Sequence, residues 1–269
     1  MKTIFITGAS SGFGKETAKL FQLKGWNVIA TMRSPEEEQE LTKLDNVLVV
    51  ELDVQNEKSI KAAVKKGIEK FAKIDALLNC AGYAVMGIFE TATEEQIKNQ
   101  FDVNLFGMMR TTQAVLSHMR ENRKGVIINI SSVAGRVGLP FASIYESSKF
   151  AVEGFSEALN FEVGNFGIKC KIIEPGSSQT NFGNAKKSTR NQIEEYIPFL
   201  SKFYENYPNK TAHCKLAIPQ EVAQTIYNAV TDESSKMRYI IGEDCQFFVG
   251  IKENNSEENY VKRIQDFFK

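Results

Sequence analysis

Short apolar runs alternate with longer amphipathic stretches along this chain, at intervals of about 25 to 30 residues, as strand–helix units do. The first run, residues 2–7, leads directly into a glycine-rich turn and then into a stretch with helical spacing. Alternating strands and helices build a parallel sheet with helices on both faces. We therefore expect an α/β fold with a doubly wound, seven-stranded parallel sheet, its strands at 2–7, 27–31, 47–52, 75–78, 125–130, 169–174 and 238–241.

Apolar residues at helical spacing fill the intervals between these runs. One helix is expected to begin at Pro35, because proline is favoured at the first helical position. In the stretch 142–165 the apolar positions cover more than one face, which suggests burial on the sheet and also against another subunit. The other helices are expected at 15–24, 57–72, 94–120, 219–230 and 256–268.

The length of 269 residues suits one large domain, 1–269, without a linker. Basic and acidic residues balance and no basic block occurs, so we expect neither nucleic acid nor a membrane surface as a partner. No apolar run approaches the roughly 18 residues of a membrane span, and none resembles a signal peptide. The four cysteines lack metal-ligand or disulfide spacing, so we expect thiols, no metal site and a cytoplasmic protein.

Three glycines, Gly8, Gly12 and Gly14, stand in the turn between the first strand and its helix. Glycine admits positive φ and lets the backbone approach a ligand closely. The start of the helix adds unpaired N–H groups and the positive end of the helix dipole. The turn is therefore predicted to bind the pyrophosphate of a dinucleotide, as in a Rossmann fold. An ordinary glycine-rich turn is the alternative.

Arg33 and Ser34 follow the second strand, where dinucleotide folds meet the adenosine ribose. An acidic residue there accepts a hydrogen bond from the 2′-hydroxyl of NAD, whereas an arginine can hold the 2′-phosphate of NADP. No carboxylate occurs before Glu36, so the sequence favours NADP(H) over NAD(H). An exposed loop arginine is the alternative at this position. Asp53, at the end of the third strand, fits either a cofactor contact or a simple turn residue.

Tyr145 and Lys149 are four residues apart, which places both side chains on one face of a helix. An ammonium near a phenol favours the phenolate and lowers the pKa of the phenol from its usual value of about 10. The pair is therefore predicted to exchange a proton with an alcohol or carbonyl oxygen, and Ser132 would donate to the same oxygen. The alternative is a half-buried ring beneath a solvated charge. Asn104 stands in the middle of an expected helix, where a solvated polar position is the simplest explanation.

Residues 177–215 break the alternation and form an insertion after the sixth strand, which ends at Pro175 and Gly176. The insertion is polar at first and then aromatic. Because it follows the carboxyl edge of the sheet, it is a candidate lid over a substrate site. Its aromatic residues either line a pocket for a bulky apolar substrate or only pack the insertion onto the body.

These motifs, in this order and spacing, resemble the short-chain dehydrogenase/reductase family over roughly the first 180 residues and the last strand. The matching positions are Thr7, Gly8, Gly12, Gly14, Asp53, Asn79, Ala81, Gly82, Asn104, Ser132, Tyr145, Lys149, Pro175, Gly176 and Thr180. Cys80 departs from the family, which usually has a second asparagine there; because this position mainly supports the wall of the cofactor pocket, we expect little consequence. Arg33 resembles the NADP-preferring members. The stretches 173–176 and 238–242 resemble the 17β-hydroxysteroid and retinol dehydrogenase-like branch.

The resemblance implies that Tyr145 protonates a carbonyl oxygen as hydride arrives, while Ser132 polarises that oxygen. It also implies that Lys149 lowers the pKa of the phenol and that Asn104 holds a water between Lys149 and solvent. The cofactor contacts that it implies, together with those expected from the motifs, are Gly8, Ser10, Ser11, Gly12, Phe13, Gly14, Arg33, Ser34, Asp53, Val54, Asn79, Ala81, Gly82, Tyr145, Lys149, Pro175, Gly176 and Thr180.

The expected activity is hydride transfer between NADP(H) and a carbonyl or secondary alcohol. The substrate is expected to be bulky and apolar. The helices around 104–120 and 142–165 resemble the dimer-forming pair of the family, so a homodimer or homotetramer is expected. A catalytically silent NADP-binding regulator with the same fold is the alternative, and an assay of NADPH oxidation with ketones and aldehydes distinguishes the two.

Overall fold

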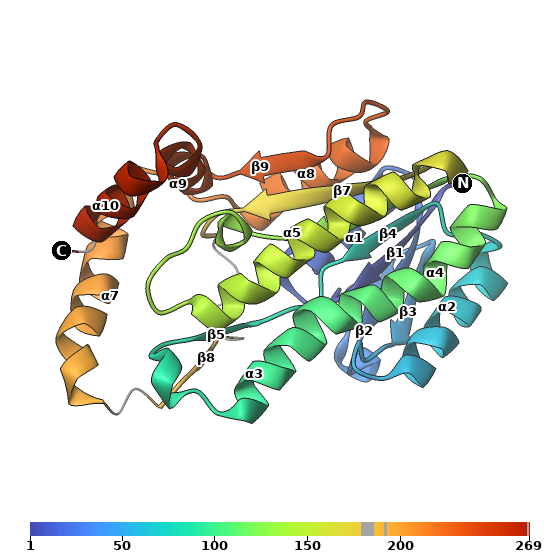
Figure 1. The fold of residues 1–269 in the computed structure, drawn as a ribbon. Coiled ribbons are helices and arrows are strands. Elements are labelled where there is room, and N and C mark those ends of the chain that lie inside the picture. Colours follow the sequence, from blue (N-terminus) through green and yellow to red (C-terminus); the bar gives the residue numbers. More distant parts are fainter. Residues whose placement is uncertain (179–185, 191–192, 268) are drawn as a thin grey trace.

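The computed structural model describes residues 1–178, 186–190, 193–267 and 269. Its main sheet has seven parallel strands in the order β3-β2-β1-β4-β6-β7-β9, which confirms the expected doubly wound sheet (Figure 1). The strands are β1 Thr3–Thr7, β2 Asn27–Met32, β3 Val47–Glu51, β4 Ala76–Asn79, β6 Gly125–Ile130, β7 Ile168–Pro175 and β9 Arg238–Ile241.

Helices cover both faces of this sheet because successive strand residues point to opposite sides. Ile4 and Ile6 pack with α1 and α8 in one core, whereas Phe5 packs with α2, α4 and α5 in the other. The helices of the described chain are α1 Gly12–Leu23, α2 Glu57–Phe71, α3 Glu94–Phe101, α4 Met108–Glu121, α5 Ser143–Val163, α7 Ile197–Thr211, α8 Pro219–Thr231, α9 Glu243–Glu253 and α10 Glu257–Phe267.

The prediction of a helix that begins at Pro35 is wrong. Two short 3₁₀ turns, η1 Pro35–Glu37 and η2 Leu41–Lys43, occupy this stretch instead. One Glu38 carboxylate oxygen accepts from the backbone N–H groups of Glu40 and Leu41, at 2.8 and 3.0 Å. This side chain supplies the backbone with an alternative to helical hydrogen bonds. The α9 helix, in contrast, was not anticipated; it begins after Gly242, whose φ of 99° suits glycine.

The helix expected over 94–120 is interrupted by a π-helical segment, η4 Asp102–Gly107, between α3 and α4. A Cβ on Gly107 would lie 2.7 Å from Cβ of Val54, so η4 and the loop after β3 make a close approach that needs glycine. Single π-helical turns inside helices occur frequently at functional sites. Here the turn contains Asn104.

The described part of the 177–215 insertion forms β8 Lys186–Ser188, the 3₁₀ turn η7 Glu194–Tyr196 and α7. The β8 strand pairs in parallel with β5 Ala84–Met86, outside the main sheet. In Figure 1, α7 stands beside α10 at the end of the molecule away from α2. In the described residues, every helix is too short or too polar to cross a bilayer.

Candidate active site

A cleft of about 450 Å³ lies along the carboxyl ends of β1, β2, β3 and β4. Ligands of open α/β sheets bind at this edge. Ten residues expected to contact a cofactor line it: Gly8, Ser10, Ser11, Gly12, Phe13, Arg33, Asp53, Val54, Ala81 and Gly82. The sequence predicted a place in the pocket wall for Cys80, which also lines the cleft. The other lining residues were not predicted to contact a cofactor: Met32, Leu52, Gln55, Tyr83, Asn99, Val103 and Lys187.

The glycine turn forms a cradle that side chains would fill. Gly8 and Gly12 have φ values of 72° and 54°, which glycine adopts without strain. A Cβ on Gly8 would lie 2.9 Å from Cα of Ala81. Ser11, the N-cap of α1, makes no side-chain capping bond, so the first N–H groups of the helix are not used by that residue. Such N–H groups at a helix start suit a pyrophosphate, and the cradle therefore fits a dinucleotide.

An exposed cation, Arg33, lines the cleft directly after β2, where the sequence predicted the adenosine ribose. The nearby Lys15 is engaged elsewhere, because its ammonium lies 3.1 Å from Glu38 and 3.0 Å from Glu40. Asp53 lies at the cleft and also shapes its own loop, since its carboxylate accepts from the backbone N–H of Gln55 at 2.9 Å. The position of Asp53 thus fits both alternatives, a cofactor contact and a turn residue.

Several expected cofactor residues do not line the cleft. A Cβ on Gly14 would lie 2.3 Å from the carbonyl oxygen of Gly8, so Gly14 lets α1 pack against the turn. The Asn79 amide donates to Thr112 and Asn129, at 3.0 and 2.8 Å, and so ties β4 to α4 and β6. Thr180 lies outside the described residues, and the other expected contacts outside the cleft lining are Ser34, Tyr145, Lys149, Pro175 and Gly176.

Ser132, Tyr145 and Lys149 meet at the end of β6 and the start of α5. The Ser132 hydroxyl acts on the Tyr145 phenol as a hydrogen-bond donor that lowers its pKa. The Lys149 ammonium lies 5.8 Å from the centre of the Tyr145 ring and donates to the carbonyl oxygen of Ile130 at 2.7 Å. The Ser132 hydroxyl is also held by the carbonyl oxygen of Pro175, at 3.3 Å. The sequence-predicted acid/base cluster is therefore assembled in space.

Burial dominates the electrostatics of this cluster. It raises the pKa of Tyr145 to about 12, against the hydrogen bond from Ser132, and lowers the pKa of Lys149 to about 8. The net shift of the Tyr145 pKa is therefore upward, opposite to the lowering expected from the sequence. At neutral pH Tyr145 is a neutral phenol, which is the form that can donate a proton.

Asn104 is not a solvated helix position, because only 3% of its surface is exposed. Its amide oxygen accepts from the backbone N–H of Tyr83 at 3.1 Å, and its amide nitrogen donates to the Tyr83 carbonyl at 2.9 Å. The same nitrogen lies 3.3 Å from the hydroxyl oxygen of Ser148, next to Lys149. Asn104 thus joins the loop after β4 to α5.

Sequence reasoning missed Lys187, which lines the cleft from β8. Its ammonium lies 5.2 Å from the centre of the Tyr83 ring, and so a second cation faces the cleft besides Arg33. The adjacent lysines at 186 and 187 were visible in the sequence. No local pattern indicates that they join β5, about 100 residues earlier, because such pairing depends on the fold.

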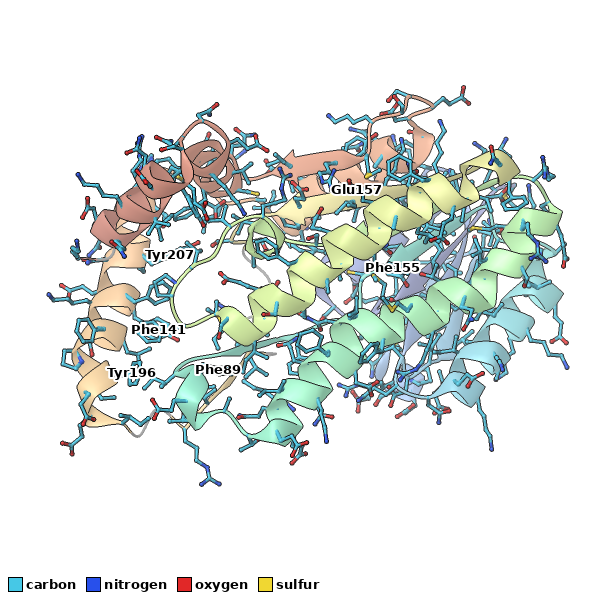
Figure 2. All side chains as sticks on the ribbon, in the orientation of Figure 1. Phe89, Phe141, Phe155, Glu157, Tyr196 and Tyr207 are labelled. Carbon is cyan, nitrogen blue, oxygen red and sulfur yellow. The ribbon has the colours of Figure 1, made fainter. Side chains whose placement is uncertain are left out.

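Some aromatic residues of the insertion pack onto the body. The Phe203 ring lies 5.7 Å from that of Phe141, and Tyr207 stacks on Phe248 with ring centres 5.9 Å apart. Figure 2 shows Tyr207 and Phe141 between α7 and the loop before α5. In contrast, Phe199 and Tyr204 are exposed, by 67% and 50%. Packing onto the body thus explains some of the aromatic residues of the insertion, whereas Phe199 and Tyr204 remain available at the surface.

Fold and cleft are those of a Rossmann-type α/β protein, and comparison with known proteins places it more closely. A family model for short chain dehydrogenases matches residues 2–191. The chain is 42% identical over 244 residues to a 3-ketodihydrosphingosine reductase of Bacteroides thetaiotaomicron, covering 89% of this chain and 87% of that protein. The protein therefore belongs to the short-chain dehydrogenase/reductase family, and it is an oxidoreductase.

Solved structures agree with this assignment. A short-chain dehydrogenase from Streptomyces avermitilis shares 30% identity and superposes with a TM-score of 0.84, covering 98% of this chain and 99% of that one. A serine dehydrogenase complexed with NADP⁺ shares 29% identity, with a TM-score of 0.74, over 88% of this chain and 94% of that one. A 3-ketoacyl-(acyl-carrier-protein) reductase from Brucella melitensis complexed with NADH shares 25% identity, with a TM-score of 0.77, over 90% of this chain and 96% of that one. Similar structures thus bind either form of the nicotinamide dinucleotide.

Proposed function

We propose that this protein is an NADP(H)-dependent reductase of ketones, acting through Ser132, Tyr145, Lys149 and Asn104. The observation that carries the proposal is the cluster itself: the Lys149 ammonium lies 5.8 Å from the centre of the ring of a neutral Tyr145, and Ser132 acts on the pKa of that phenol as a hydrogen-bond donor. Arg33 at the end of β2 supports NADP(H) as the cofactor. All four cysteines are free thiols, which supports a cytoplasmic enzyme.

The chemistry that bound NADPH supplies is a hydride for the carbonyl carbon. Tyr145 donates its phenolic proton to the carbonyl oxygen, so that C=O becomes CH–OH. Ser132 donates a hydrogen bond to the same oxygen and polarises the carbonyl. The Lys149 ammonium stabilises the phenolate that remains until a proton returns from solvent. Asn104 fixes the position of the loop after β4 against α5.

A ketone on a long alkyl chain is the substrate class that we propose. Similarity to the Bacteroides 3-ketodihydrosphingosine reductase extends over most of both chains and beyond the glycine turn. The exposed aromatic residues of α7 and η7, among them Phe199 and Tyr196, offer apolar surface on the insertion after the sixth strand. Apolar lining with a few polar groups is typical of sites for such ligands.

The test is an assay of NADPH oxidation with 3-ketodihydrosphingosine and with short and aromatic ketones, using the wild type and Tyr145→Phe. We expect turnover of the long-chain ketone, and a loss of at least about 100-fold in the variant because general acid catalysis contributes about 10²- to 10⁴-fold. NADPH binding, followed by its fluorescence, should change little. Wild-type rates in the variant would contradict the catalytic assignment, and failure of every ketone would contradict the proposed activity.

A further inference from the structure

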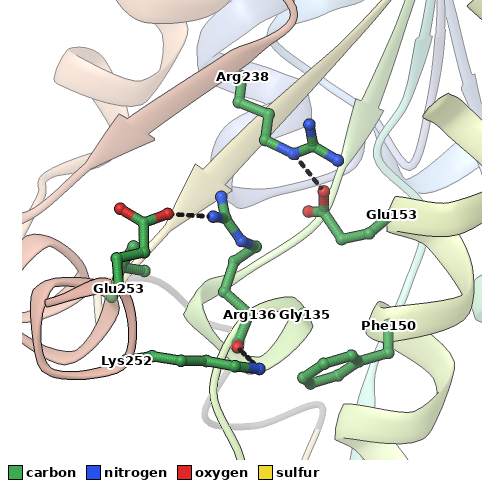
Figure 3. Close-up of a pocket in the computed structure, with 8 residues that line it drawn as sticks. Gly135, Arg136, Phe150, Glu153, Arg238, Lys252 and Glu253 are labelled. Carbon is green, nitrogen blue, oxygen red and sulfur yellow. Dashed lines mark hydrogen bonds and ion pairs between the residues drawn. The ribbon is translucent and has the colours of Figure 1, made fainter. Parts of the chain in front are cut away.

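A second cavity, of about 220 Å³, lies behind the catalytic helix, between α5, the η5 turn Val133–Gly135, β9 and α9. Figure 3 shows its lining, in which Glu153, Arg136 and Arg238 face one another. Glu153 is one helical turn beyond Lys149, which is itself one turn beyond Tyr145. Residues at this spacing share a helix face. Glu153, which lines the cavity, therefore lies on the same face of α5 as Tyr145 and Lys149.

Glu153 is buried, with 6% of its surface exposed, and it is held from one side only. Its Oε2 accepts from Nε of Arg238 at 3.0 Å, whereas its Oε1 has no hydrogen-bond partner among the described residues. Arg238 also donates to Glu157 at 2.6 Å and lies 3.4 Å from Glu174. Arg238 therefore holds the Glu153 carboxylate in an ion pair.

Glu153 is one of two groups that oppose the effect of burial on Lys149. Burial lowers the pKa of Lys149, and the groups that oppose this are Cys80 and Glu153. However, burial also raises the pKa of the Cys80 thiol to about 11, so Cys80 is uncharged near pH 7. The Tyr145 phenol is uncharged there as well. The opposing charge therefore comes from Glu153.

The remaining charged groups pair around Glu153. Nη1 of Arg136 donates to both carboxylate oxygens of Glu174, at 3.0 and 3.1 Å, and Nη2 of Arg136 donates to Glu253 at 2.5 Å. The Lys252 ammonium donates to the Arg136 carbonyl at 2.6 Å. Burial raises the pKa of Glu174 to about 7, and that of Glu146, beside Tyr145, to about 8. Both carboxyl groups therefore hold a proton for much of the time near neutral pH.

We propose that Glu153 is a positioning residue for proton transfer: its carboxylate, held by Arg238, keeps the Lys149 side chain a charged ammonium beside Tyr145. Without this charge, burial alone would leave more of Lys149 as a neutral amine. A neutral amine stabilises a phenolate much less than an ammonium does. The inference about Lys149 needs only the folded chain, whereas its consequence for the rate depends on the proposed function.

The charge of Lys149 can be measured without cofactor or turnover. Trace acetylation with acetic anhydride across a range of pH, followed by mass spectrometry of the Lys149 peptide, gives the midpoint at which its amine becomes reactive. Access to the buried amine changes the rate but not this midpoint. In Glu153→Gln we expect a midpoint about half a unit to one unit lower, and acetylation at pH 7 about three- to fivefold faster.

Glu157→Gln is the matched control, because Glu157 contacts the same arginine from one turn farther along α5. It should leave the midpoint close to that of the wild type. An unchanged midpoint in Glu153→Gln, or an equal shift in Glu157→Gln, would overturn the proposal. Glu153→Asp and Glu153→Asn form a second pair of similar size that differ in charge, and the midpoint should be lower in Glu153→Asn. This pair keeps the test valid even if Glu153→Gln folds poorly.

The pH dependence of ketone reduction gives the second readout. In Glu153→Gln the alkaline limb of the kcat/KM profile should move to lower pH by the amount measured for Lys149. A lower rate with an unshifted profile would mean that Glu153 has only a structural role. If the wild type reduces no ketone, the proposed function fails while the acetylation result stands by itself.

Discussion

Arg33, exposed in the cleft directly after β2, is the residue that we propose for the choice between NADPH and NADH. Arg33→Ala should weaken NADPH binding about 10- to 100-fold, because a hydrogen bond to a charged group is worth about 1.5 to 3 kcal/mol. NADH has no 2′-phosphate, so its affinity should change about threefold or less. Titration of both cofactors by fluorescence measures the two losses. An equal loss for NADH would remove Arg33 from the 2′-phosphate site.

Glu146 links the stability of the protein to pH. Its pKa rises from 4.5 to about 8 through burial, and its carboxyl oxygen accepts from the backbone N–H of Leu139 at 2.7 Å. Between these pH values the native state holds a proton that the unfolded chain has lost. This contribution to stability is therefore fully present below about pH 4.5 and is lost as the pH rises through 8.

Glu146→Gln should remove much of this dependence, since the glutamine amide oxygen can accept the same bond and cannot ionise. Urea unfolding at pH 5 and pH 8 measures it. We expect the wild type to lose more of its free energy of unfolding than the variant, by on the order of 3 kcal/mol. Glu174, whose pKa is also raised, contributes with the same sign to both proteins. Equal losses in the two proteins would contradict the assignment to Glu146.

Among the elements, β8 brings a cation to the cleft from the insertion. Successive strand residues point to opposite faces, so Lys186 and Lys187 on β8 differ in direction while they share charge and exposure. Lys187→Gln should weaken NADPH binding about 3- to 10-fold and reduce its dependence on salt, because a cation near phosphates acts through screened attraction. Lys186→Gln is the control, and a loss of the same size there would mean that general charge, rather than position, is responsible.

Local patterns were sufficient to predict most elements and many of the residues that line the candidate cleft. Each strand of the main sheet, the glycine turn and the Tyr145–Lys149 spacing are encoded within a few residues. The π-helical η4 was not predictable, because it accompanies the bonds from Asn104 to Tyr83, 21 residues away in the chain. The partner of Glu153 is 85 residues away. The high pKa of Tyr145 was missed for the same reason, since burial is set by the whole fold.

At the scale of the whole molecule, α5 presents apolar surface that the described part of the chain leaves exposed. Phe150 and Phe161 are exposed by 41% and 72%, and their spacing of eleven residues places them on one face of the helix. Between them lies Gly154, where an added Cβ would contact nothing within 4 Å. A face of this kind permits close approach of a second helix. We propose that it forms the contact of a homodimer or a homotetramer.

Phe161→Glu should dissociate this assembly, because burying a phenylalanine contributes about 1.5 to 3 kcal/mol and a buried unpaired carboxylate costs more. Light scattering coupled to size exclusion at micromolar concentration gives the mass of each variant. Leu23→Glu is the control: Leu23 is 78% exposed at the end of α1, on the opposite face of the sheet. We expect a monomer for Phe161→Glu and an unchanged assembly for Leu23→Glu. A monomeric wild type, or the same loss of mass in both variants, would show that α5 does not form the interface.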